Sequence, residues 1–149
     1  MFLQRLRTRA YLRALIVVAV SVAVVLEAGM SATDFDNLWN YDDPAGTEQA
    51  FRSLLKSSEK VFDIHWQLEL KTQIARTLGL QQKFADAHAL LDTIERQLPG
   101  TTPRVRVRYL LERGRVFNSD QHADSALSLF KQSFDLATEQ KLDFFSVDA

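Results

Sequence analysis

The 149-residue chain contains no cysteine, three prolines and only five glycines. Without cysteine there is no disulfide, no zinc–thiolate site and no thiol nucleophile. The sequence also lacks a glycine-rich phosphate loop and the G-x-S-x-G motif of serine hydrolases. The formal net charge of −1 argues against a nucleic-acid binder, because such proteins carry a marked basic excess.

The side chains that most often bind metals or catalyse reactions form no recognisable pattern. His65, His88 and His122 make no HExxH motif, and no two of them are one helical turn apart. The segment 33–43, TDFDNLWNYDD, holds four aspartates, but it lacks the central glycine and distal glutamate of a calcium-binding EF-hand loop. We therefore expect no metal, no cofactor and no enzymatic activity.

Residues 1–32 have the pattern of a secretory signal peptide or a short N-terminal membrane anchor. Arginines cluster ahead of an uncharged apolar run at residues 14–26, namely Arg5, Arg7, Arg9 and Arg13. A spanning helix needs about 20 apolar residues, so this shorter run favours a signal peptide over an anchor. We expect an exported or inner-membrane-anchored protein. The alternative is a cytoplasmic protein whose true start is Met30.

Residues 70–99 predict two amphipathic helices folded into a hairpin. Apolar residues recur at helical spacing in both halves: Leu70, Ile74, Ala75 and Leu78, then Phe84, Ala87, Leu91, Ile94 and Leu98. Gly79 is expected to end the first helix with a positive φ, and Pro99-Gly100 to end the second. Ala75 and Ala87, twelve residues apart, are the small side chains at which the two helices would cross.

Helices are also predicted on both sides of this hairpin. One runs from Pro44 to about residue 60, with Asp43 as its N-cap, and Asp63 caps the helix that leads to Gly79. Thr102 and Pro103 begin a helix to Phe117; although RVRVRYLL alternates like a strand, the longer window keeps helical spacing. A partner helix spans 123–140, with Gly114 and Ala126 as a second small pair. Residues 142–149 begin a third hairpin, and 33–43 is expected to be an extended segment whose aromatics dock on the first helix.

The hairpin at 70–99 resembles the tetratricopeptide repeat (TPR), a helical hairpin of about 34 residues. The similarity covers the small pair, the large apolar residues beside it and the closing Pro99; Gln82 stands where the family has a turn glycine. It implies an all-α fold in which about six antiparallel helices, at residues 33–149, stack as a short right-handed solenoid after an apolar N-terminal helix.

The resemblance also implies a function, because the first helices of TPR hairpins line a concave groove that holds a peptide or a partner helix. Candidate groove residues share helix faces in the two hairpins: Glu69, Thr72 and Arg76, then Arg104, Arg108, Leu111 and Arg115. Arginine suits this role because its planar fork binds carboxylates bidentately. The alternative is a solvated charged face. We expect a non-catalytic protein–protein interaction module or scaffold.

Two other functions stay open: a structural or truncated remnant of a longer TPR protein, and an accessory subunit of an enzyme. The chain stops soon after its third hairpin begins, and repeat arrays normally end in a polar capping helix. An apolar surface is therefore expected to stay uncovered and to favour self-association, formed by Phe134, Ala137, Phe144, Phe145 and Val147.

Overall fold

The computed structural model describes residues 34–58 and 63–148. Within these ranges the chain forms one short 3-10 helix, six α-helices and no strand, so the predicted all-α class is confirmed. The predicted signal peptide or anchor at residues 1–32, with its apolar helix, lies outside the described residues and stays a prediction. No helix in the two described ranges is both long and apolar enough to cross a lipid bilayer.

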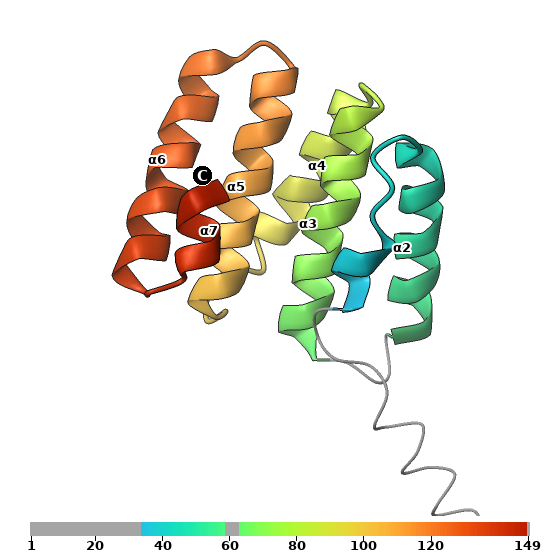
Figure 1. The fold of residues 1–149 in the computed structure, drawn as a ribbon, viewed down its shortest axis with the longest axis horizontal. Helices are drawn as coiled ribbons and strands as arrows, with labels where there is room; N and C mark the ends of the chain where they lie inside the picture. The colour runs from blue at the N-terminus through green and yellow to red at the C-terminus, as the bar shows by residue number, and fades with distance from the viewer. Residues whose placement is uncertain (1–33, 59–62, 149) are drawn as a thin grey trace, which may run out of the picture. The chain divides into compact units, whose positions relative to one another are not determined.

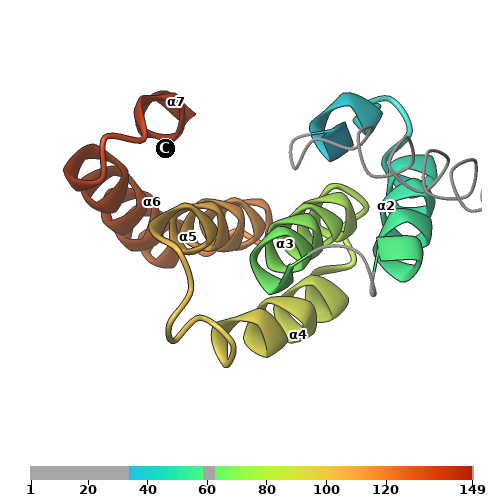
Figure 2. The same ribbon diagram turned by 90° about the horizontal axis from the view of Figure 1, so that it is seen from below.

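The helices follow the order η1 (Asp34–Leu38), α2 (Pro44–Ser58), α3 (Ile64–Leu80), α4 (Phe84–Glu95), α5 (Pro103–Ser119), α6 (Ala123–Glu139) and α7 (Asp143–Asp148). The helices α2, α3, α5 and α6 stand side by side in that order, and α4 packs behind α3 and α5 (Figure 1). Figure 2 shows η1 and α7 on the opposite side of α3 and α5 from α4. The first and last of the described elements therefore lie over the same helix face.

Three predicted N-caps are confirmed. The Asp43 carboxylate accepts a hydrogen bond from the Gly46 N–H at 2.9 Å, and the Asp63 carboxylate accepts one from Trp66 at 2.9 Å. The Thr102 hydroxyl faces the Val105 N–H at 3.5 Å. Each cap satisfies a backbone donor that the first helical turn leaves without a partner.

The predicted role of Gly79 is wrong. The helix α3 continues to Leu80, and Gly79 is a buried helical residue, where a Cβ would lie 3.2 Å from Val116 of α5. Gly79 therefore permits close approach of α3 and α5. The left-handed residue of the turn is Gln82, with φ 59°, and the later turns repeat this feature at Gln121 and Lys141.

Buried apolar side chains form one main core between α2, α3, α4 and α5. Ala75 and Ala87 are both fully buried there, as expected of small residues at a helix crossing. In the second hairpin Gly114 and Ala126 are also buried, and Gly114 lies against a large ring of α6. The atoms nearest to a Cβ built at Gly114 all belong to Phe130, one helical turn beyond Ala126.

The aromatic segment before α2 docks as predicted, but it is not fully extended. Phe35 contacts Phe51 of α2 edge to face at 6.3 Å between centroids, and Trp39 contacts the same ring at 5.3 Å. The 3-10 helix η1 shortens the distance between residues four apart, and this lets both rings reach one partner. An extended chain would hold them too far apart.

The C-terminal apolar surface is smaller than predicted. Ala137 and Phe145 are buried with Val107 and Leu111 in a second core cluster, because α7 folds back over α6 and α5. Phe134 and Phe144 stay exposed as predicted, and the side chain of Val147 lies outside the described residues.

Candidate functional site

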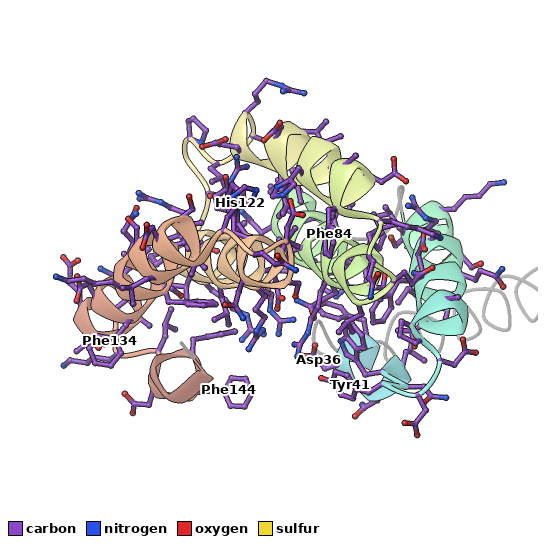
Figure 3. All side chains as sticks on the ribbon, turned by 90° about the horizontal axis from the view of Figure 1, so that it is seen from above. Asp36, Tyr41, Phe84, His122, Phe134 and Phe144 are labelled. Atoms are coloured by element: carbon purple, nitrogen blue, oxygen red, sulfur yellow. The ribbon has the colours of Figure 1, made fainter. Side chains whose placement is uncertain are left out.

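A groove of about 420 Å³ lies over α3 and α5, between the η1 segment and α7. The two long helices form its floor, and the shorter elements form its walls. Figure 3 shows Asp36 and Tyr41 on one wall, with Phe144 on the opposite side. The floor residues are Gln73, Arg76, Arg108, Leu111 and Glu112, and the walls add Trp39 and Phe145.

The structure brings only part of the predicted residue stripe into this groove. Arg76, Arg108 and Leu111 line it, whereas Arg115 lines a smaller neighbouring hollow of about 150 Å³ that also touches Arg76. Glu69 and Thr72 are buried instead. The Thr72 hydroxyl donates to the carbonyl of Glu69 within the same helix at 2.7 Å, so it does not face a ligand.

Arg108 is held from several sides. Its Nη1 and Nη2 donate to the two carboxylate oxygens of Asp36, both at 3.0 Å, and its Nε lies 3.6 Å from Glu69. The rings of Phe35 and Phe145 lie 5.2 and 5.4 Å from its guanidinium carbon, within cation–π range. Arg108 therefore joins η1, α5 and α7 at one point.

The Glu69 carboxylate forms ion pairs with two arginines of α5. Both of its carboxylate oxygens accept from Nε of Arg104, at 3.1 and 2.9 Å, and Arg104 also lies 5.4 Å from the ring of Phe145. A buried carboxylate is stable only when such donors compensate for its lost hydration. The predicted acidic residue of the groove is thus part of the scaffold.

Glu112 organises the other end of the groove floor. Its Oε1 accepts from Gln73 at 3.1 Å and from Arg115 at 2.8 Å. Gln73 in turn accepts from the indole N–H of Trp39 at 3.1 Å. These hydrogen bonds hold the Trp39 indole over α3. The Glu112 carboxylate also neutralises the charge of Arg115.

Arg76 is the least compensated cation of the groove. Its one ion pair among the described residues is with Glu112 at 3.7 Å, which is too long for a hydrogen bond. The guanidinium lies over the rings of Trp39 and Tyr41 at 5.2 and 5.3 Å, and its side chain is 24% exposed. Its N–H donors are therefore oriented by the two rings but are not used by a carboxylate.

Several groove residues carried no recognisable signal in the sequence. Trp39 and Tyr41 were predicted only to dock on a helix, and Asp36 was noted only as one of the four aspartates of their segment. Gln73 and Glu112 are ordinary polar residues of amphipathic helices. The aspartate-rich aromatic composition of 33–43 was the one available hint. It did not reveal which helix face the segment would cover.

Two of the three histidines face the same acidic side chain. Nε2 of His88 and Nε2 of His122 lie 3.4 and 3.7 Å from the same oxygen of Asp120, at the turn between α5 and α6. The part of the chain that the structure describes holds no group of three side chains placed to bind a metal ion.

The resolved pKa shifts lie outside the groove. Burial raises the pKa of Tyr109 to about 12. Partial burial pushes the pKa of Glu48 upward, but hydrogen bonds from Gln81 and Arg52 and the charges of Arg52 and Lys83 outweigh it and lower that pKa.

Comparisons of the chain with protein-family models, with curated proteins and with solved structures found no match.

Proposed function

We propose that the chain is a non-catalytic, TPR-type protein-interaction module that binds a carboxylate-bearing peptide or partner helix in the groove over α3 and α5. Two antiparallel hairpins, α3–α4 and α5–α6, support this assignment, as do their small buried residues Ala75, Ala87, Gly114 and Ala126. The residues of left-handed conformation in their turns, Gln82 and Gln121, are 39 positions apart. That spacing is a little longer than the family period of about 34 residues.

The observation that carries the proposal is that Arg76 has no hydrogen-bonded carboxylate among the described residues. Burying or half-burying a guanidinium without a hydrogen-bonded anion is costly, so such groups are normally paired. Arg108 and Arg115 have close carboxylate partners within the chain, but among the described residues the one carboxylate paired with Arg76 is that of Glu112, at 3.7 Å. A carboxylate of a bound partner would supply the missing acceptor.

The opposite wall supplies an apolar contact. Phe144 is 75% exposed at the edge of the groove, and its ring is a large apolar surface that a partner side chain could cover. The partner segment that fits best carries an acidic residue for Arg76 and an apolar residue for Phe144.

A selection of phage-displayed random peptides on the purified chain tests this proposal. The wild type should enrich acidic peptides, and Arg76→Gln should lose that enrichment. Arg76→Lys should retain part of it, because lysine keeps the charge but lacks the planar fork. Arg106→Gln is the matched control, since Arg106 is an exposed arginine of α5 outside the groove. Enrichment of the same acidic peptides by Arg76→Gln would exclude Arg76 as the anchor, and no enrichment by the wild type would contradict the groove function.

Phe144 provides a second test. Phe144→Ala should weaken binding of the enriched peptides without lowering the melting temperature, because the ring is exposed. Phe134→Ala removes an equally large exposed ring from α6, away from the groove lining. If both variants bind as the wild type does, the apolar wall plays no part in recognition.

A further inference from the structure

The ion pair between Asp36 and Arg108 is asymmetric in its exposure. The Arg108 side chain is 6% exposed, whereas the Asp36 side chain is 41% exposed. Both residues line the groove. The cation is therefore fixed inside the protein, and its anion lies at the surface.

The surroundings of Arg108 leave one edge of its guanidinium for an anion. Phe35 and Phe145 both lie within cation–π distance of the guanidinium, and Nε lies nearest to Glu69. The remaining edge, with Nη1 and Nη2, holds the Asp36 carboxylate in a two-pronged pair. This fork-to-fork geometry is the one that arginine uses to bind carboxylates in general.

The two partners differ in how easily they can leave the pair. Arg108 is a buried residue of α5, so its guanidinium cannot turn out to solvent without breaking the core. Asp36 belongs to the short helix η1, which is anchored by the fully buried Phe35 next to it. A change of the Asp36 side-chain rotamer would move the carboxylate into water and leave Phe35 in place.

We propose that Asp36 is a built-in competitor in the groove, occupying on Arg108 the position that an acidic side chain of a bound partner takes. This inference rests on the proposed peptide-binding function and adds a mode of regulation to it. Exchange of one carboxylate for another conserves the charge balance of the buried cation, with Glu69 and Arg104 keeping their contacts. A partner with two acidic residues would then engage Arg76 directly and Arg108 by displacing Asp36.

Chemical rescue by a small carboxylate tests the position on Arg108 without any peptide. Asp36→Ala should melt at a lower temperature than the wild type, because it leaves a buried cation less compensated. Sodium formate, compared with sodium chloride at the same concentration, should raise the melting temperature of Asp36→Ala and have little specific effect on the wild type. Asp42→Ala is the matched control, since Asp42 is an exposed acid of the same segment that does not line the groove.

Equal effects of formate on the two variants and the wild type would overturn the inference. Asp36→Asn provides a second, milder variant if Asp36→Ala does not fold; its amide neutralises the charge and keeps the shape, and formate should again stabilise it selectively.

A binding measurement tests the competition itself. The probe is a short fluorescein-labelled peptide in which glutamate alternates with leucine. Asp36→Ala should bind it about tenfold more tightly than the wild type, as expected when a competing charge-assisted contact of roughly 1.4 kcal/mol is removed. Asp42→Ala should bind it like the wild type.

The two experiments separate failure of this inference from failure of the proposed function. Peptide binding of equal strength by all three proteins would overturn the competition and leave the groove function standing. No binding by any of them would contradict the groove function for acidic partners. The formate response then decides the inference, because only a response confined to the Asp36 variants shows that Arg108 accepts an external carboxylate.

Discussion

The ring of Phe130 lies so close to the backbone of Gly114 that a Cβ at this position would be 2.7 Å from the ring. Gly114 is on α5 and Phe130 is on α6, so their contact sets how closely the second hairpin closes. A glycine in a helix interior costs about 1 kcal/mol relative to alanine. The contact with Phe130 gives a packing reason for that cost.

Gly114→Ala should therefore destabilise the chain by about 1–2 kcal/mol, since the overlap with Phe130 outweighs the gain in helix propensity. In the background of Phe130→Ala the same substitution should become neutral or stabilising, because the overlapping ring is gone. Urea unfolding of the wild type, both single variants and the double variant gives the coupling energy. Additive effects would mean that the ring does not restrict residue 114.

The carboxylate of Glu48 joins α2 to the turn between α3 and α4, through a hydrogen bond from Gln81 at 2.8 Å and an ion pair with Lys83 at 3.7 Å. Its pKa is lowered from 4.5 in the folded chain, so the unfolded state binds protons more readily. The resulting stability is fully present above the unfolded pKa and is lost as the pH falls through the folded pKa.

Glu48→Gln should accordingly reduce the free energy of unfolding by about 1 kcal/mol near pH 7, and by much less near pH 3. Urea unfolding of the two proteins at both pH values measures the difference. Glu139→Gln is the control, because Glu139 is exposed on α6. A Glu48→Gln effect that does not depend on pH would contradict the assigned network.

Gln82 and Gln121 adopt left-handed conformations, with φ of 59° and 62°. Such a conformation costs an L-residue about 1–2 kcal/mol, whereas glycine adopts it readily. Gln82→Gly and Gln121→Gly should each stabilise the chain by roughly 0.5–1 kcal/mol, after the greater chain entropy of glycine is counted. Thermal unfolding measures this. Gln140→Gly, at φ −90° in the third turn, should destabilise the chain. A change in stability of the same sign for all three variants would show that backbone conformation does not determine the effect.

An apolar strip on α6 is expected to drive weak self-association. Leu127 and Phe134 are 70% and 48% exposed and, being seven residues apart, share one helix face. Burial of such a side chain contributes about 1.5–3 kcal/mol before the costs of association. The apparent molar mass from light scattering should increase with concentration for the wild type and not for Leu127→Glu/Phe134→Glu. Ile64→Glu, on α3, is the control, and a monomeric wild type would refute the expectation.

Local features of the fold were predictable from the sequence, because their causes are local. Asp43, Asp63 and Thr102 cap helices through donors a few residues away, and the apolar periodicity of α3 and α4 indicates which faces are buried. Gly79 shows the limit of this approach. A glycine near a helix end fits either a positive φ or a close helix contact, and only the position of Val116 on another helix decides between them.

The candidate site was predictable only in part, because a spacing pattern does not reveal which acid neutralises which base. Of the arginines in the predicted stripe, Arg76 and Arg108 line the groove, but Arg108 is matched by Asp36, 72 positions earlier. Burial of Glu69 likewise depends on Arg104 from another helix. These pairings are tertiary, and no local rule encodes them.

The floor and the walls of the groove are expected to form at different stages of folding. Its floor comes from hairpins whose helices meet after turns of a few residues, whereas its walls are joined through Arg108 by a contact that spans 72 positions. Closing a long loop costs more entropy than closing a short one, and distant contacts form more slowly. The hairpins can therefore assemble early, and the walls close over them late. A partner that needs both walls would bind only chains that have completed folding.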